Sequence, residues 1–263
     1  MKTITIAIPT YKRAALMQAT LDAMIDEGIH RIPGVEILVR DNNSPDNTYE
    51  ILVDYKQRYG ISISRNARNH GMNDNIGSVL KSCTTDYMVL TSDEDPIRRA
   101  GLQQIQNLLQ SNSFAFASTV FNIDGKVYRG VVQGVLPIPP QHFHLSSFYI
   151  SGLVFHTRLA QSCWSEIDPF IFDQRNVYPH TYLCCLMIAR YGCYYLPIEL
   201  AYMLNKSQDS DLGEYWLTAA RLAQNDLRHE FFLHMQSAAR NEAEAAAYRA
   251  MDAVSVYRVQ SLV

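Results

Sequence analysis

Short apolar runs alternate with amphipathic stretches over the first hundred residues. Four runs of mainly aliphatic and β-branched side chains are typical of buried strands, at residues 3–8, 35–39, 61–64 and 87–90. Apolar residues recur at helical spacing in the stretches between them, at residues 14–26, 48–55 and 73–82. This alternation predicts an α/β fold with a mainly parallel central sheet flanked by helices, which binds ligands at the carboxyl ends of its strands.

The pattern changes after residue 110. A turn at Asp124-Gly125 and a Pro-rich, flexible connection over 132–140 separate predicted strands at 114–121, 126–128 and 153–155. A helix is predicted at 178–186. Two long helices rich in Ala, Leu, Arg and Glu follow, at 214–236 and 241–260, and the first has a wide apolar face.

Three consecutive carboxylates, Asp93-Glu94-Asp95, follow the fourth predicted strand. Like charges at the end of a buried strand repel one another, so such a cluster usually has a cation beside it. Carboxylates suit Mg²⁺ or Mn²⁺, and Mg²⁺ commonly shares its coordination shell with substrate phosphates. The alternative interpretation is a solvated acidic turn that caps a helix beginning near Pro96.

Composition narrows the class of protein. The chain has 263 residues, of which 48% are hydrophobic and 19% charged, as in a globular protein with a sizeable core. The net charge of −3 gives no basic field for nucleic acid, and no apolar run is long enough to span a bilayer. The N-terminus enters a strand pattern without a signal peptide, and the five cysteines show no paired spacing. We therefore expect a cytoplasmic protein that does not bind nucleic acid.

Four polar segments resemble the motifs of the family 2 glycosyltransferases, which have the GT-A fold. They are Ile-Pro-Thr-Tyr-Lys-Arg at 8–13, Asp-Asn-Asn-Ser-Pro-Asp-Asn-Thr at 41–48, Asn-His-Gly-Met-Asn-Asp-Asn at 69–75, and Asp93-Glu94-Asp95. The resemblance covers residues 3–110 firmly and 145–200 loosely. No Gly-x-Gly-x-x-Gly motif or Gly-rich Lys-Ser/Thr loop is present, so a nucleotide must be held in another way.

The resemblance implies a nucleoside-diphosphate-sugar donor. Pro9, Thr10 and Tyr11 would line the base and ribose pocket, where the Tyr11 ring offers a face for stacking. Arg13 would reach a phosphate, unless it is an ordinary surface residue. Asn69 would also contact the donor, with a plain turn residue as the alternative.

The family reads the base with an acidic pair after the second strand, and here that pair is Asp41-Asn42. An amide can both donate and accept a hydrogen bond, so CDP-, dTDP- and GDP-sugars stay open beside UDP-sugars. The metal motif departs as well, because Ser92 stands in the place of its first acid. Asp93 would then meet the ribose, and Glu94 or Asp95 would hold Mn²⁺ or Mg²⁺, a Lewis acid for the departing diphosphate.

The acid pair that supplies the general base in inverting family members is missing. Its place in the sequence is Tyr178-Pro179-His180, and a histidine suits a base near neutrality. The alternative for His180 is a side chain that satisfies a helix N-terminus. Asp173, and then Asp168, are the next candidates. Ser151-Gly152 resembles a step found near the reacting sugar, where glycine permits close backbone approach, or it is a plain turn.

We predict a GT-A catalytic domain at 1–205, with a nucleotide-sugar half at 1–110 and an acceptor half at 111–205, and a helical extension at 206–263. The extension is a packed layer or a homodimer seam, or it contacts a membrane peripherally at its inner face. The predicted function is metal-dependent transfer of a hexosyl or deoxyhexosyl group to a glycan or lipid-linked glycan, as in abequosyl-type enzymes of cell-surface polysaccharide synthesis. The alternatives are a non-catalytic nucleotide-sugar binding module and a nucleotidyltransferase.

Overall fold

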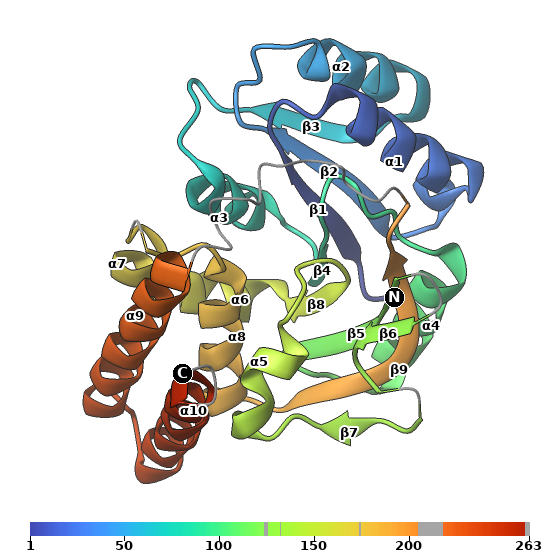
Figure 1. Ribbon diagram of the computed structural model, residues 1–263. Helices are drawn as coiled ribbons and strands as arrows, with labels where there is room; N and C mark the ends of the chain where they lie inside the picture. Colours follow the sequence, from blue (N-terminus) through green and yellow to red (C-terminus); the bar gives the residue numbers. More distant parts are fainter. Residues whose placement is uncertain (124–125, 132, 174, 205–217, 261–263) are drawn as a thin grey trace.

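The structure is a computed structural model, and it describes the chain except residues 124–125, 132, 174, 205–217 and 261–263 (Figure 1). Strands and helices alternate through the N-terminal half, as the sequence predicts. In order they are β1 (Ile4–Thr10), α1 (Ala14–Asp26), η1 (Ile29–Arg31), β2 (Val35–Asp41), α2 (Thr48–Tyr59), β3 (Ser62–Arg65), α3 (Met72–Ser82), β4 (Tyr87–Leu90) and α4 (Arg99–Ser111).

The described part of the C-terminal half contains five further strands, several short helices and two long ones at the end. In order the elements are β5 (Phe116–Ile123), β6 (Lys126–Arg129), β7 (Leu136–Pro137), η2 (Pro140–His142), α5 (Phe143–Ser146), β8 (Leu153–His156), α6 (Thr157–Glu166), α7 (Asp168–Ile171), α8 (Pro179–Arg190), β9 (Cys193–Tyr202), α9 (Thr218–Ser237) and α10 (Glu242–Gln260). The predicted turn at 124–125 lies outside the described residues.

All nine described strands belong to one sheet, ordered β3-β2-β1-β4-β8-β5-β9-β7, with β6 paired to β5. The pairs β3–β2, β2–β1 and β1–β4 are parallel, which confirms the prediction for the first half. β8 is antiparallel to both of its neighbours, β4 and β5. This strand therefore brings the segment before it, residues 149–152, to the same edge as the acidic segment that follows β4.

Two hydrophobic cores cover the two faces of the sheet. Successive side chains of a strand point to opposite faces. Ile6 and Ile8 accordingly belong to one cluster, with residues of α1 and α4, while Ala7 belongs to the other, with residues of α3 and α8. A sheet that is buried on both faces explains why these strands read as nearly continuous apolar runs.

The helix after the acidic segment begins at Arg99, later than the predicted start near Pro96. The reason is that residues 96–98 extend along β9. Ile97 forms a bridge with Ala201, and the Arg98 amide donates to the Leu200 carbonyl at 2.8 Å. The short extended segment continues the sheet beyond the acidic turn.

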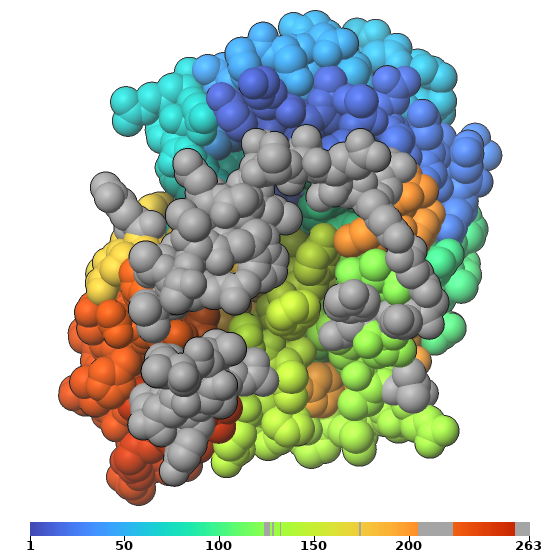
Figure 2. All heavy atoms as spheres, in the orientation of Figure 1, coloured from blue at the N-terminus to red at the C-terminus, as the bar shows by residue number. Residues whose placement is uncertain are grey.

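The C-terminal helices α9 and α10 pack against each other and against α8 (Figure 1). Phe231, Phe232 and Tyr248 are fully buried in the same core cluster as Phe155 of β8. In the space-filling view, these helices and the N-terminal elements lie at opposite ends of the molecule (Figure 2). Among the described helices, none combines the length and the apolar character that crossing a bilayer requires.

Candidate active site

The site lies where β1 and β4 end side by side. Thr10 is the last residue of β1, and its hydroxyl donates to the Asp93 carboxylate at 2.7 Å. Both side chains are buried. Burial raises the pKa of Asp93, while the Thr10 hydrogen bond and the positive charge of Arg13 lower it. The predicted donor residues Thr10, Arg13 and Asp93 are therefore brought together.

Asp95 is the most deeply buried carboxylate of the acidic segment. It accepts a hydrogen bond of 2.6 Å from the Ser151 hydroxyl through Oδ2. Its other oxygen, Oδ1, is buried and accepts no well-formed hydrogen bond within the described structure, although the Tyr149 hydroxyl lies near enough to lower the carboxyl pKa. Burial first, and then the charges of Glu94 and Asp93, raise the pKa of Asp95 to about 7.

These carboxylates suit a divalent cation only in part. The described residues include no group of three or more His, Cys, Asp or Glu side chains arranged around one point. Mg²⁺ does not need such a group, because one or two carboxylates are sufficient when phosphates and water complete its shell. A cation would satisfy Asp95 Oδ1 and favour the ionised carboxylate. Glu94, which is half-buried, and Asp95 would hold it.

Asp41 and Asn42, the predicted base readers, face the protein interior in this structure. Asp41 is fully buried and accepts hydrogen bonds from the amide and hydroxyl of Ser44, together with an ion pair from Arg65 at 3.0 Å. The Asn42 amide donates to Asn69 Oδ1 at 2.8 Å and to the Gly71 carbonyl at 3.0 Å. Both polar groups are therefore engaged in holding the loops after β2 and β3.

The same hydrogen bonds account for Asn69, whose side-chain oxygen also accepts from the Gly71 amide. This geometry is that of a turn residue, the alternative considered from the sequence. Two neighbouring residues, one exposed and one half-buried, were missed by the sequence reasoning. Lys12 and Asn43 adopt the left-handed conformation, with φ of 56° and 60°, and the Lys12 amide donates to the Ser44 hydroxyl. Asparagine tolerates this region, whereas a lysine there is strained, and this strain lies directly after the end of β1.

Tyr11, the aromatic residue predicted to meet the base, is accessible to solvent. Tyr11 is 39% exposed, directly after β1, while Pro9 inside the strand is paired with Arg40 of β2. The Tyr11 ring can therefore meet a planar base without rearrangement of the core. Pro9 instead fixes the strand end from which Thr10 and Tyr11 project.

His180 lies in the first turn of α8 and is only 5% exposed. Its Nε2 atom is 3.1 Å from the Ser147 carbonyl, and burial lowers its pKa to about 4. A neutral ring in this position holds α8 against residue 147. Its placement does not suit a base that must reach a substrate hydroxyl, and the catalytic role stays a prediction.

Asp173, the other predicted base, lies on the loop after α7. It accepts hydrogen bonds from Arg175 at 2.8 and 3.0 Å, and these contacts lower its pKa. Arg175 also pairs with Glu230 of α9 at 2.8 Å. Asp173 is therefore ionised at neutral pH and partly exposed, but the arginine occupies its oxygens. Asp168, at the start of α7, has one buried oxygen without a hydrogen bond in the described structure.

Arg129 and the residues it contacts hold the segment 149–152, which in turn hydrogen-bonds to the acidic segment. Arg129, at the end of β6, is buried and donates hydrogen bonds to the carbonyls of Thr119, Tyr149 and Ser151. Sequence reasoning missed Arg129 because a lone arginine in a hairpin carries no motif. Ser151 and Gly152 lie beside the acidic segment, and their expected place near the reacting sugar stays a prediction.

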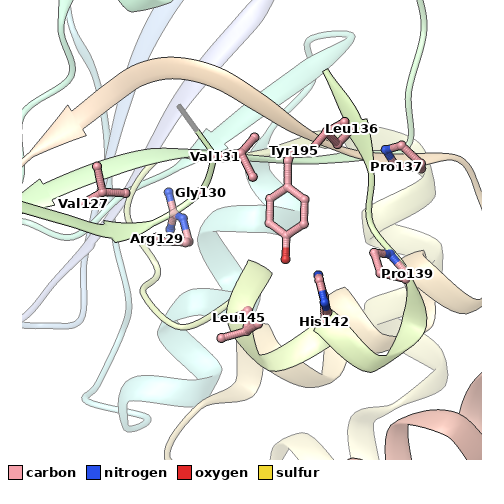
Figure 3. A pocket seen from close by; sticks show the side chains of 10 residues that line it. All are labelled: Val127, Arg129, Gly130, Val131, Leu136, Pro137, Pro139, His142, Leu145 and Tyr195. Carbon is pink, nitrogen blue, oxygen red and sulfur yellow. The ribbon is translucent and has the colours of Figure 1, made fainter. Parts of the chain in front are cut away.

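An apolar hollow of about 500 Å³ has Arg129 among its lining residues (Figure 3). Tyr195 and His142 point toward each other across it, with ring centres 6.1 Å apart. Its remaining lining residues are Val127, Arg129, Gly130, Val131, Leu136, Pro137, Pro139 and Leu145. The lining contains no carboxylate.

Comparison with known proteins identifies the family to which this chain belongs. The sequence pattern of glycosyl transferase family 2 matches residues 5–171, which include Thr10, Tyr11 and the acidic segment 93–95 but not Asp173 or His180. The chain therefore belongs to glycosyl transferase family 2, and its fold is the GT-A fold of the glycosyltransferases. The abequosyltransferase RfbV of Salmonella typhimurium is 26% identical over 112 residues, a match that spans 42% of this chain and 33% of that protein.

Solved structures show the same fold. TarS residues 1–349 of S. aureus, in complex with UDP-GlcNAc, matches 98% of this chain and 73% of its own length, with a TM-score of 0.75 and 12% identity. The mannosyltransferase PcManGT of Pyrobaculum calidifontis, in complex with GDP-Man and Mn²⁺, matches 99% of this chain and 74% of its own length. Its TM-score is 0.59 and its identity 16%.

Proposed function

We propose that the protein transfers a sugar from a nucleoside-diphosphate-sugar to a hydroxyl of a carbohydrate acceptor, with a divalent cation bound at the acidic segment. The observation that supports this most directly is Asp95, a buried carboxylate with one oxygen that lacks a well-formed hydrogen bond within the described structure. It stands at the carboxyl edge of the sheet, where α/β folds bind their ligands.

Each residue of the crevice takes a role in this proposal. Tyr11 stacks against the base, and Asp93, oriented by Thr10, accepts a hydrogen bond from the ribose. Arg13 lies close enough to Asp93 to influence its pKa, and it faces the diphosphate. Glu94 and Asp95 hold Mn²⁺ or Mg²⁺, which when bound supplies a Lewis acid for the leaving diphosphate.

The donor nucleotide is proposed from what is exposed. Because the polar atoms of Asp41 and Asn42 are used internally, the base meets Tyr11 and backbone atoms rather than a buried carboxylate. This arrangement sets no strong preference for uracil. Two solved relatives are complexes with UDP-GlcNAc and GDP-Man, so UDP- and GDP-sugars belong in the test panel, together with the CDP- and dTDP-sugars that the sequence leaves open.

The acceptor is proposed to be a glycan or lipid-linked glycan of cell-surface polysaccharide synthesis, and the reaction to take place in the cytoplasm. This proposal is supported by the sequence match to an abequosyltransferase.

The catalytic base remains His180 or Asp173. His180 would have to leave its contact with the Ser147 carbonyl, and Asp173 its contact with Arg175, before either could accept a proton.

A calorimetric donor panel tests the proposal. UDP-, CDP-, GDP- and dTDP-sugars are titrated with Mn²⁺ and with EDTA, and turnover is followed by release of the nucleoside diphosphate. We expect binding of at least one donor that collapses in EDTA, and a loss of that binding in Glu94→Gln. Donor binding and turnover that are unchanged in EDTA would refute the role of the cation.

A second candidate is a non-catalytic nucleotide-sugar binding module. The burial of His180 and the absence of the family's acid pair are the observations that favour it. A protein that binds a donor with Mn²⁺ but neither hydrolyses nor transfers it, with any acceptor glycan tested, would decide for the module.

A further inference from the structure

Arg129 is a buried cation without an ion-pair partner among the described residues. It is 2% exposed, and burial lowers its pKa to about 10. The apolar hollow that Arg129 helps to line has no carboxylate among its lining residues (Figure 3). The negative charge of Asp95 lies near enough to raise the pKa of Arg129, although no described carboxylate forms a direct ion pair with it. A buried charge is costly unless hydrogen bonds satisfy it, and the acceptors around the guanidinium supply those bonds.

Those acceptors are mainly backbone carbonyls from two separate segments. Nε donates to the Thr119 carbonyl of β5 at 3.1 Å. Nη1 donates to the Tyr149 carbonyl, and Nη2 donates to the Ser151 carbonyl at 2.6 Å. One planar side chain therefore ties the segment before β8 to the β5–β6 hairpin at several points. Lysine could not reproduce this fork, because its charge is compact and its donors are not held in one plane.

The segment held in this way has no spare room. Gly152 has a φ of +78°, and a Cβ atom added there would lie 2.9 Å from Thr119 Oγ1 and 3.3 Å from Arg129 Nη2. The Thr119 hydroxyl donates in turn to the Gly152 carbonyl at 2.8 Å. Residues 149–152 are thus fixed by contacts with β5 and Arg129 on one side.

On its other side the same segment contacts the acidic turn. The Ser151 hydroxyl donates to Asp95 Oδ2 at 2.6 Å and accepts from the Ser92 amide at 3.0 Å. The Gly152 amide donates to the Leu90 carbonyl at 2.9 Å. A shift of the 149–152 backbone would therefore move both ends of the acidic turn.

We propose that Arg129 is a positioning residue, which holds Tyr149–Gly152 so that Ser151 fixes the carboxylate of Asp95 in its working orientation. The inference rests on the proposed transfer reaction, because it assigns Asp95 to the donor-binding site. Arg129 acts through the segment it holds, because its hydrogen bonds within the described structure go to Thr119, Tyr149 and Ser151 rather than to the acidic turn. Misplacing a reacting group by about 1 Å can cost about 100-fold in rate.

The test uses Arg129→Met, Arg129→Lys, Ser151→Ala and the double variant Arg129→Met/Ser151→Ala in the full chain. Arg190→Met is the matched control. Arg190 is also a buried arginine, but it pairs with Glu166 and Glu244 beneath the C-terminal helices. Turnover, donor affinity and thermal midpoint are measured for each variant, together with hydrogen exchange of the peptide that contains Ser151 and Gly152.

We expect Arg129→Met to lower kcat about 10- to 100-fold, with donor KM changed less than about threefold, because the base pocket does not depend on it. Arg129→Lys should recover part of the loss. Adding Ser151→Ala to Arg129→Met should cost little more, because both residues act through one contact. Arg190→Met should lower the thermal midpoint while leaving kcat near that of the parent.

Three results would overturn the inference: kcat within about twofold in a folded Arg129→Met variant, additive effects in the double variant, or an equal loss of kcat in Arg190→Met. The hydrogen-exchange measurement needs no activity. Faster exchange at residues 151–152 in Arg129→Met than in Arg190→Met supports the proposal that Arg129 fixes this segment. If no donor is turned over at the same time, the proposed transfer has failed on its own, and the positioning role of Arg129 still stands. Unchanged exchange there refutes the hold itself.

Discussion

Asp95, the proposed metal ligand, is a carboxylate whose charged form is costly to bury. Its carboxyl pKa is raised from the ordinary value to about 7 by burial, and secondarily by Glu94 and Asp93. Between pH 4 and pH 7 the folded state therefore holds a proton that the unfolded state has released. The folded protein loses stability through this group as the pH rises across that window, and it regains none above it.

Asp95→Asn should separate stability from function. Above pH 7 the uncharged amide removes a buried charge, so the thermal midpoint at pH 8 should equal or exceed that of the parent. Donor turnover should fall at least 100-fold, because an amide is a weak ligand for a hard cation. Differential scanning fluorimetry at pH 5.5 and 8, with turnover assays, checks both. Asp86→Asn is the control, since Asp86 is half-exposed beside Lys2 and should leave turnover unchanged. A large fall in the midpoint at pH 8 would contradict the buried-charge argument.

His180 gives the opposite pH dependence. Its pKa is lowered to about 4 by burial, so between pH 6.5 and 4 the unfolded state takes up a proton that the folded state does not. The free energy of unfolding should therefore fall on acidification across this window, by about 3 kcal/mol in total for this group. In His180→Gln this part of the loss should disappear. Urea titrations at pH 7, 5.5 and 4.5 measure it.

His229→Gln serves as the control for that measurement, because His229 is 49% exposed and pairs with Asp252 at the surface. Its acid sensitivity should resemble that of the parent. An unchanged pH slope in His180→Gln would show that the ring is protonated in the folded state, and it would revive the histidine as a group exchanging protons near neutrality.

At the scale of elements, α9 shows how the apolar face predicted from the sequence is used. Phe231 is fully buried and meets the rings of Phe170, Tyr182 and Tyr248, which come from three different helices. The helix boundary near Pro96 could not be predicted in the same way. Whether residues 96–98 begin a helix or extend along β9 depends on a strand a hundred residues later.

Phe231→Ala should lower the free energy of unfolding by about 3–5 kcal/mol, because it leaves a cavity between α7, α8 and α10. Leu233→Ala, in the same helix but 49% exposed, should change it by less than about 0.5 kcal/mol. Denaturant titrations of the two variants make the comparison. Equal effects would indicate that α9 does not pack as described.

At the scale of the whole molecule, the sequence-based division into residues 1–205 and 206–263 is a prediction that deletion can test. A chain that ends at Leu204 would expose the apolar residues of α8 and the adjoining core that α9 and α10 now cover. We expect it to aggregate or to lack a cooperative thermal transition. Soluble, cooperatively folding material would establish an independent catalytic domain.

The fold was predictable from the sequence because local and global signals agree in the first half. Each of the first four strands is a short apolar run between amphipathic helical stretches, and the strand-end motifs have the family spacing. The site was predictable only where chemistry is visible in one segment, as at Thr10 and the acidic segment. Asn42 hydrogen-bonds to Asn69, which is 27 residues away in the chain, and Arg129 to Ser151, which is 22 residues away. No local sequence pattern predicts contacts of this kind.

The antiparallel insertion of β8 between β4 and β5 also has a consequence for biosynthesis. A ribosome releases the acidic turn long before residues 149–156, which complete its hydrogen bonds. A nascent chain that has folded only its parallel strands presents three carboxylates without their serine and arginine supports. The proposed donor site is therefore expected to form late, when β8 docks, and unfinished chains should not bind sugar nucleotides as the finished protein is proposed to do.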